Sequence, residues 1–293
     1  MPLLLKAGAD ITIKDSAGRN ALHVAAKNCD SSSLSLFLEK PAAVSIINQK
    51  DLKGRTPLIL ACGTGSGFTN GVALLLNAGA STEERDDNGN TAIHASILTN
   101  TDLASKELSQ IILQKNSGLL NAKNNMGQTP LMLSLQNKKP ETSDYILELH
   151  PDVLAKDNLN NTSLHYACSS GMEDSVKKIV SLGADLNVLN SQNESPICIA
   201  SKKQYENISD NLLKISGINI DTKDSKGKSA RNYLADLYNL RHEQSSKRWE
   251  KYFNERQEAW NRAASARDSK YKLENENRER ESENRSLQRK IDR

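Results

Sequence analysis

Histidine and cysteine side chains are the first candidates for chemistry in this chain of 293 residues, which contains five histidines and four cysteines. Three of the histidines, His23, His94 and His165, are evenly spaced along the sequence. Such regular spacing suggests a metal site, because imidazole nitrogen is a common zinc ligand. Zinc holds its ligands at about 2 Å, so the interpretation depends on whether the elements that carry the three rings bring them together.

The cysteines are separated from one another and form no C-x-x-C pair. They are Cys29, Cys62, Cys168 and Cys198. We expect reduced, buried thiols rather than disulfides or metal ligands, which favours a cytoplasmic or nuclear location. The sequence has no apolar run of about 18 residues, and its apolar opening ends at Lys6, so we expect neither a membrane span nor a signal peptide.

A glycine-rich stretch at residues 63–71 resembles a phosphate-binding loop at first sight. It lacks the G-K-[ST] ending, and Phe68 stands where G-x-G-x-x-G needs its last glycine. The sequence also has no H-E-x-x-H or G-x-S-x-G motif. We therefore predict that the chain is not an enzyme and has no catalytic, cofactor-binding or metal-binding residues.

The elements that carry the histidines are copies of one repeating unit. Its core begins seven times, with a period of about 35 residues. The seven starts are Gly18, Gly54, Gly89, Gly127, Asn160, Asn193 and Gly227. Each core contains a version of G-x-T-P-L-H-x-A-A, and the last copy is the most degenerate. Repeats of this length indicate a solenoid in which each unit packs on its neighbours.

Residues 157–189 show how the unit is built. Thr162 can cap a first helix in which Leu164, Ala167 and Cys168 share one face. A second helix follows and ends at Gly183, a residue type that tolerates the left-handed backbone of a helix end. Two helices this short cannot bury their apolar faces alone. The third unit has the longest spacing, and we expect residues 98–105 to lengthen the turn between its helices.

The repeated core, together with endings such as Leu-Leu-Lys-Ala-Gly-Ala-Asp at residues 4–10, resembles the ankyrin-repeat family over about residues 1–235. The resemblance implies an all-α solenoid of helix-turn-helix layers with β-turn fingers, of which the first repeat is incomplete. The start resembles the end of a second helix, so we expect a fragment of a longer chain or a degenerate cap. Layers about 10 Å apart would place successive histidines about 20 Å apart, too far to share a metal. In this family the histidine typically fixes the turn by hydrogen bonding.

Residues 236–293 form a second region of different character. This region has 15 basic and 12 acidic side chains and contains neither Pro nor Gly, which predicts a long charged helix. Heptads can be drawn over residues 249–291, although several core positions are polar. Self-association as a coiled coil and a free or partner-bound helix both remain open. The repeats hold 24 basic and 24 acidic residues, so we expect no nucleic-acid binding.

The resemblance implies that the concave side of the stack and its fingers bind a protein partner, which the sequence does not identify. We expect a non-enzymatic scaffold or adaptor. Two alternatives are a regulatory or targeting region of a larger enzyme and a subunit of a transcription regulator. The candidate partner-binding residues are the polar finger positions Lys53, Arg55, Arg85, Asp87, Asn88, Lys123, Asn125, Lys156, Asn158, Asn190 and Gln192.

Overall fold

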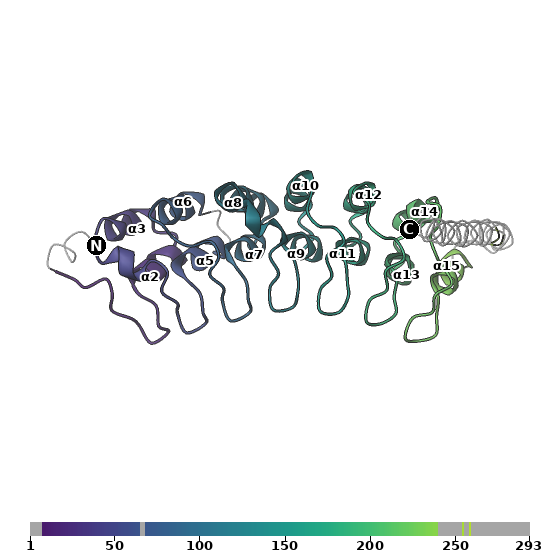
Figure 1. The fold of residues 1–293 in the computed structure, drawn as a ribbon, viewed down its shortest axis with the longest axis horizontal. Helices are drawn as coiled ribbons and strands as arrows, with labels where there is room; N and C mark the ends of the chain where they lie inside the picture. The colour runs from purple at the N-terminus through teal and green to yellow at the C-terminus, as the bar shows by residue number, and fades with distance from the viewer. Residues whose placement is uncertain (1–7, 65–67, 240–253, 255–257, 259–293) are drawn as a thin grey trace, which may run out of the picture.

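The computed structural model describes residues 8–64 and 68–239, together with residues 254 and 258. The described helices form two rows that run side by side along a curved stack, and long loops project beyond the inner row (Figure 1). The inner row consists of α2 (Ala21–Lys27), α5 (Pro57–Cys62), α7 (Ala92–Ile97), α9 (Pro130–Gln136), α11 (Ser163–Ser170), α13 (Pro196–Lys202) and α15 (Ala230–Asn239). The outer row consists of α3 (Ser31–Leu38), α6 (Thr69–Asn77), α8 (Asp102–Lys115), α10 (Pro140–Glu148), α12 (Glu173–Ser181) and α14 (Glu206–Leu213). Two short elements, α4 (Ala43–Ile46) and the 3-10 helix η1 (Ser117–Asn121), follow α3 and α8.

The inner helices begin at residues that the repeat pattern supplies. The residue before each of the first six is Asn, Thr or Ser with extended backbone, as N-caps require: Asn20, Thr56, Thr91, Thr129, Thr162 and Ser195. Three of these helices start with proline, whose missing N–H removes one of the donors that have no intrahelical partner in the first turn. The cap, joined in three layers by the proline, fixes where the inner helix starts.

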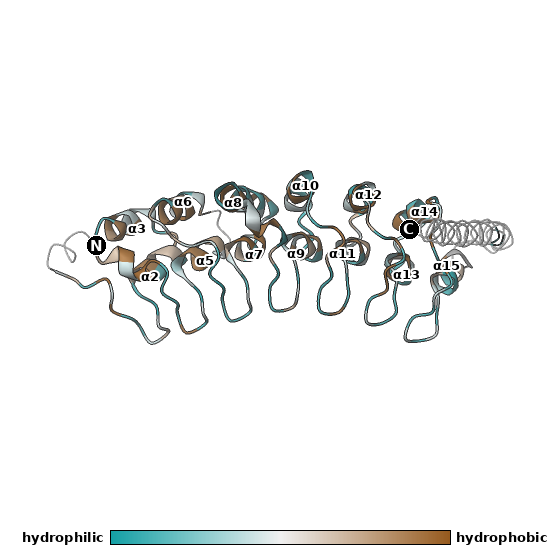
Figure 2. Cartoon of the chain, in the orientation of Figure 1, coloured by the Kyte–Doolittle hydropathy of each residue, from teal (hydrophilic) through white to brown (hydrophobic). Residues whose placement is uncertain are grey.

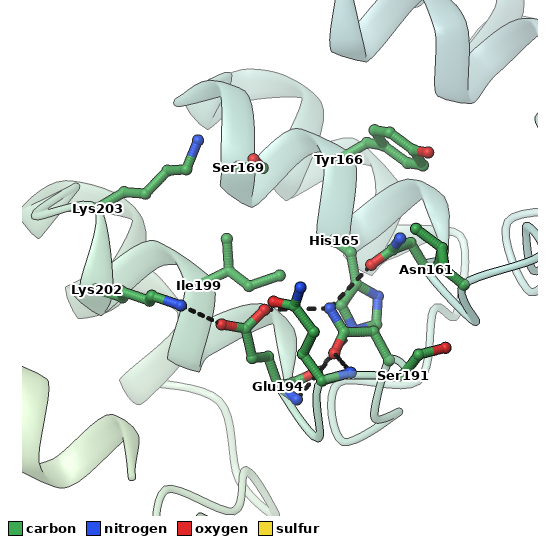
Figure 3. A pocket seen from close by; sticks show the side chains of 12 residues that line it. Asn161, His165, Tyr166, Ser169, Ser191, Glu194, Ile199, Lys202 and Lys203 are labelled. Atoms are coloured by element: carbon green, nitrogen blue, oxygen red, sulfur yellow. Dashed lines mark hydrogen bonds and ion pairs between the residues drawn. The ribbon is translucent and has the colours of Figure 1, made fainter. Parts of the chain in front are cut away.

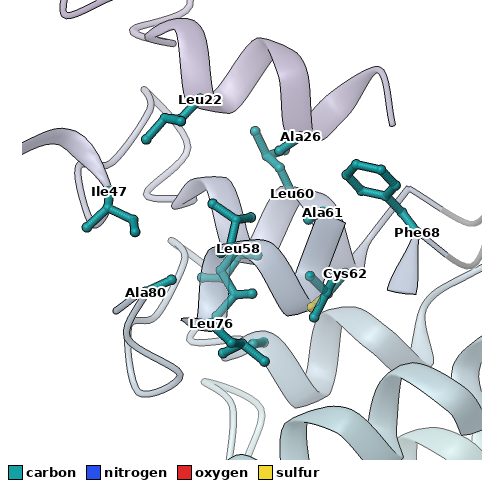
Figure 4. Packing of buried hydrophobic residues seen from close by; sticks show 14 of the residues in the cluster. Leu22, Ala26, Ile47, Leu58, Leu60, Ala61, Cys62, Phe68, Leu76 and Ala80 are labelled. Atoms are coloured by element: carbon teal, nitrogen blue, oxygen red, sulfur yellow. The ribbon is translucent and has the colours of Figure 1, made fainter. Parts of the chain in front are cut away.

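The core lies between the two rows and continues from layer to layer. Figure 2 shows the hydrophobic residues on the helices and mostly hydrophilic residues in the projecting loops. Leu22, Leu58 and Ile93 occupy the same position in three successive inner helices, and none has exposed surface. Figure 4 shows such side chains from neighbouring layers packed against one another. Each helical pair therefore buries its apolar face only because the next pair covers it.

The projecting loops are seven fingers with one shared backbone conformation. We number them from the N-terminus, fingers 1 to 7, as residues 15–19, 51–55, 86–90, 124–128, 157–161, 190–194 and 224–228. In each finger the Oδ1 atom of the first residue, Asp or Asn, accepts hydrogen bonds of 2.7–3.0 Å from the N–H groups of the third and fifth residues. The fourth residue is Gly or Asn with φ between 60° and 78°. These residue types are the ones that adopt left-handed backbone most readily.

Hydrogen bonds also join each finger to the next. The N–H group of the second residue donates to the carbonyl oxygen of the third residue of the preceding finger, over 2.8–3.1 Å. This bond occurs at all six joints, from Leu52 N to Ala17 O through Ser225 N to Gln192 O. The fingers thus form a continuous hydrogen-bonded row that sets the distance between layers, although apart from one isolated bridge between Lys223 and Ser229 the described residues contain no strand.

The third unit differs from the expected lengthened turn. α8 starts at Asp102 and has 14 residues, so the turn ends before the predicted residue 105 and the added length extends the helix. Thr101 caps α8, and Asp102 accepts hydrogen bonds from the N–H groups of Glu141 and Thr142 at the start of α10. Capping chemistry, which the spacing alone did not show, decided where the helix begins. The predicted helical or coiled-coil tail lies almost entirely outside the described residues.

We expect Gly127→Ala to lower the free energy of unfolding more than Gly227→Ala does. Both glycines have nearly the same left-handed φ, 75° and 78°. A Cβ atom at Gly127 would lie 2.8 Å from the backbone nitrogen of Asn158 in the next finger, whereas a Cβ at Gly227 would meet nothing within 4 Å.

The difference between the two variants isolates the contact between fingers from the cost of left-handed backbone, and we expect it to be about 1 to 3 kcal/mol. Urea unfolding monitored by circular dichroism measures it. If both variants lose the same free energy of unfolding, the contact between fingers 4 and 5 does not contribute to the loss.

Candidate protein-binding groove

The inner helices and the fingers form the two walls of a groove, and apolar residues line its helical wall. They occupy the fourth position after each N-cap residue, which recurs once per layer. They are Val24, Leu60, Ala95, Leu133, Tyr166, Ile199 and Tyr233. Most are buried by their neighbours, but Val24 is 38% exposed and the two tyrosines are half-buried. The side chains with exposed surface, Val24, Tyr166 and Tyr233, can contact the apolar side chains of a bound segment.

A cavity of about 510 Å³ opens where α11 and α13 face fingers 5 and 6 (Figure 3). Its apolar lining comes from Leu159, Tyr166 and Ile199. Its polar lining comes from amides, hydroxyls, one imidazole and charged groups: Asn161, His165, Ser169, Asn190, Ser191, Gln192, Glu194, Lys202 and Lys203. A size between about 300 and 1,000 Å³ is usual for a site that encloses a ligand.

Tyr166 is held in a fixed orientation in this cavity. Its hydroxyl donates to Asp157 Oδ2 over 2.7 Å and accepts from Gln128 Nε2 over 2.9 Å. Burial raises the pKa of the Tyr166 hydroxyl, and the hydrogen bond to Asp157 acts in the same direction. The hydroxyl is therefore already satisfied, and the ring is the part of the side chain that a ligand can contact.

One ion pair crosses the cavity from helix to finger. Lys202 Nζ on α13 donates to Glu194 Oε1 in finger 6 over 2.5 Å, and the Glu194 residue is 5% exposed. The hydrogen bond to Glu194 is the largest influence on Lys202 and raises its pKa. This pair fixes the finger against the helix, so Lys202 is not available as a free cation.

The three evenly spaced histidines are structural, as the resemblance implied. Each Nδ1 accepts the backbone N–H of its own N-cap residue: Asn20 at 3.3 Å, Thr91 at 3.3 Å and Thr162 at 3.1 Å. Each Nε2 lies 3.0–3.2 Å from a carbonyl oxygen of the next finger and donates to it. Each ring therefore joins a helix start to the following layer. The described residues contain no group of three His, Cys, Asp or Glu side chains that could hold a metal ion.

Burial lowers the pKa of all three histidines, because an imidazolium ion loses its water shell inside the stack. The effect is largest at His94, whose pKa falls to about 4. Folding thus disfavours the charged form of all three rings.

The described parts of the glycine-rich stretch adjoin two helices: Gly63 is the C-cap of α5, and Thr69 begins α6. Phe68, directly before α6, is 7% exposed. The Phe68 ring occupies the space that a side chain at Gly71 would fill, so glycine at this position makes room for an aromatic ring. None of the four cysteines, all of which lie in the described part of the chain, forms a disulfide, and burial raises the pKa of Cys62 and Cys168. Among the described residues, no helix combines the length and the apolar character that a membrane crossing needs.

Two of the predicted partner-binding cations brace the fingers. Arg85 donates to the carbonyl oxygens of Gly89 and Lys123 over 2.8 and 2.6 Å. Lys123 Nζ donates to the carbonyl oxygen of Lys156 over 2.8 Å. Both remain exposed at the surface while they link successive fingers. Arg55 instead pairs with Asp51 inside its own finger over 2.7 Å.

The predicted amide positions have similar roles. Asn125 Nδ2 donates to the carbonyl oxygen of Asp87, and Asn158 Nδ2 donates to that of Asn125, over 2.9 and 2.8 Å. Asn190 accepts the turn hydrogen bonds of finger 6 and lines the cavity. Lys53, Asn88 and Gln192 are exposed near the finger tips, and Gln192 also lines the cavity. Of the eleven predicted residues, the structure places only Asn190 and Gln192 at the cavity.

Sequence reasoning missed the apolar side of the cavity and both of its lysines, Lys202 and Lys203. Leu159, Tyr166, Ile199 and Lys203 were not among the candidates, although all four line the cavity. Leu159 carried a signal, since it is a large apolar residue at a finger tip and is 61% exposed. Tyr166 and Ile199 look like ordinary core positions in the pattern, and only the groove geometry distinguishes them.

Comparison with known proteins identifies the repeats. The family described as "Ankyrin repeats (3 copies)" matches residues 1–86, 66–157 and 152–224, which together span most of the chain. The chain also resembles the solved ankyrin repeat domain of Bcl-3, with a TM-score of 0.62 and 23% identity, over 76% of this chain and 99% of that one. This likeness confirms the expected all-α solenoid.

Among curated relatives, palmitoyltransferase ZDHHC13 of Homo sapiens is 30% identical over 205 residues, which are 69% of this chain and 32% of that protein. Transient receptor potential cation channel subfamily A member 1 of Homo sapiens is 28% identical over 171 residues, 57% of this chain and 15% of that protein. Neurogenic locus notch homolog protein 1 of Homo sapiens is 28% identical over 156 residues, 53% of this chain and 6% of that protein. The chain thus matches less than a third of the length of each of these relatives.

Stability should fall as the pH drops from about 6.5 to about 4, in part because of His94. In the unfolded chain this ring binds a proton near pH 6.5, whereas in the folded protein it binds one only near pH 4. Between these values the unfolded state binds more protons and is favoured. We expect His94→Gln, which has no charge to gain, to remove about 2 to 3 kcal/mol of the stability difference between pH 7 and pH 4.5.

Urea unfolding at a series of pH values measures this effect. Met132→Gln is the matched control, because Met132 occupies the same position in the fourth unit. It should leave the pH dependence of stability unchanged whatever it does to stability itself. An unchanged pH dependence in His94→Gln would show that this ring accepts a proton in the folded protein.

Proposed function

Because the chain belongs to the ankyrin-repeat family, we propose that it is a non-enzymatic adaptor whose concave groove binds an extended segment of a protein partner. Ankyrin repeats indicate a protein–protein interaction domain. The observation that carries the proposal is the cavity between α11, α13 and fingers 5 and 6, where an apolar wall and polar fingers face the same space. A bound segment can bury its side chains there and hydrogen bond through its backbone.

The charges and polar atoms of the groove support binding rather than catalysis. The layer histidines use both ring nitrogens in hydrogen bonds that hold the layers together, so they are not available as general bases. The Lys202–Glu194 pair is likewise engaged. The four cysteines, which form no disulfide among the described residues and three of which are buried, fit the cytoplasm or nucleus, which is the location that we propose.

Site-specific photo-crosslinking tests the groove directly. A photoreactive amino acid at Ser169, which lines the cavity, should give crosslinked partner protein in cells that express the full chain. The same amino acid at Lys177 on α12 is the matched control, because this outer-row residue lies in the same unit and its side chain is 54% exposed. We expect crosslinks from position 169 and few or none from position 177. Equal crosslinking from both positions would contradict binding in the groove.

A second candidate function is the regulatory or targeting region of a larger enzyme. The 30% identity to a palmitoyltransferase, of which the match covers 32%, favours it. The intact mass of the endogenous protein, detected with an antibody against the fingers, distinguishes the two proposals. A mass near the 32.3 kDa of this chain supports the adaptor, and a much larger mass supports the enzyme region.

A further inference from the structure

The cavity between α11 and α13 has an apolar side that no other element of the described chain covers. Leu159 at the tip of finger 5 is 61% exposed, and Tyr166 is half-buried with its ring held by hydrogen bonds at the hydroxyl. Ile199 lies at the base of the cavity and is 8% exposed. Side chains that are already ordered lose little entropy when a ligand packs on them, which favours an apolar anchor at this point.

The same cavity carries one more positive than negative charge. Glu194 is the carboxylate among its lining residues, and Lys202 neutralises it. Lys203 is the next residue, is exposed, and takes part in none of the ion pairs found among the described residues. Figure 3 shows the Lys203 side chain apart from the Lys202–Glu194 pair. A carboxylate that enters the cavity is attracted to Lys203, whereas an entering ammonium group is repelled.

We propose that this cavity is a subsite for a partner segment in which a large apolar side chain and an acidic side chain lie close together. The apolar side chain packs against Leu159, Tyr166 and Ile199, and the carboxylate pairs with Lys203. The exposed amide of Gln192 and the side chain of Asn161 border the same space and can bond to the segment's backbone. The inference rests on the proposed groove function and specifies its ligand chemistry.

The register of the repeats explains why the subsite occurs at this layer. Lys203 is the eighth residue after its N-cap, a position that holds no charged residue in the other six units. The position before it, occupied here by the paired Lys202, holds Lys27 in the first unit and Asp236 in the last. In the last unit Asp236 pairs with Lys228 over 3.1 Å, which cancels the local charge. Finger 1 has Ala17 where finger 5 has Leu159, so the first unit has a cation but no large apolar tip. The apolar tip, the tyrosine and the unpaired lysine coincide at fingers 5 and 6.

Selection from a library of random dodecapeptides displayed on phage tests the proposal with the full chain as the target. We expect enriched peptides to carry Asp or Glu within about three residues of Phe, Leu, Ile or Met. Selection on Lys203→Glu should replace the acidic residues with Lys or Arg. Synthetic copies of the acidic peptides should bind the Lys203→Glu variant about tenfold more weakly than the original chain, as measured by fluorescence anisotropy.

Two control variants test whether the charge and the apolar tip act within the cavity. Lys27→Glu makes the same charge reversal on the inner row near the other end of the stack and should leave peptide affinity unchanged. Leu159→Asn removes the apolar tip, so it should weaken binding of the same peptides. Finger 3 carries Asn88 at the same position, so we expect the fold to be retained. Thermal unfolding of each variant confirms that the fold is retained.

The outcomes distinguish the subsite from the proposed function. Peptides that bind in the groove, as judged by loss of binding in Leu159→Asn, but show no acidic preference and no response to Lys203→Glu would overturn the subsite alone. If no peptide is enriched, or if the enriched peptides are indifferent to every groove variant, both the subsite and the groove function are contradicted.

Discussion

Hydrogen bonds between successive fingers fix the spacing of the layers, and the other features of the structure depend on that spacing. Each finger first satisfies its own backbone through an Asp or Asn side chain, and its second residue then donates an N–H to the preceding finger. The distance between adjacent helical pairs is therefore nearly fixed. At the resulting distance Leu58 and Leu131 can be buried by neighbours, which a single pair of short helices could not achieve.

The histidines show how the same constraint removes chemistry from residues that could perform it. His94 and His165 are of the residue type that serves in metal and acid–base sites. Each nevertheless accepts one backbone hydrogen bond and donates another to the next layer. The fourth unit lacks this residue and has Met132, whose sulfur lies 3.5 Å from the backbone nitrogen of Thr129. The unit keeps its place in the stack because the finger bonds and the N-cap remain. The histidine bridge therefore reinforces a geometry that the fingers already define.

Specificity for a partner arises where the repetition is broken. Fingers 3 to 5 are braced by cations and asparagines, for example Arg85 to Lys123 and Asn158 to Asn125. Finger 5 adds an apolar tip at Leu159, and Lys203 follows a lysine at the end of α13 that is already paired. These departures from the repeat pattern converge on one cavity because neighbouring layers bring their inner helices and fingers to the same side. A rigid, regular stack thus positions a small irregular site.

The sequence by itself determined the repeat period and the capped starts of the inner helices, because these depend on residue type and on spacing within one repeat. The finger turns and the structural role of His23, His94 and His165 were implied by the resemblance to the ankyrin repeats. Only the tertiary structure decided that Arg85, Lys123 and Asn125 brace fingers, and that Leu159, Tyr166 and Lys203 share a cavity. The physical reason is that exposure and pairing depend on which side chain of a neighbouring layer reaches a given atom. The repeat pattern is the same for a lysine that forms an ion pair and for one that does not.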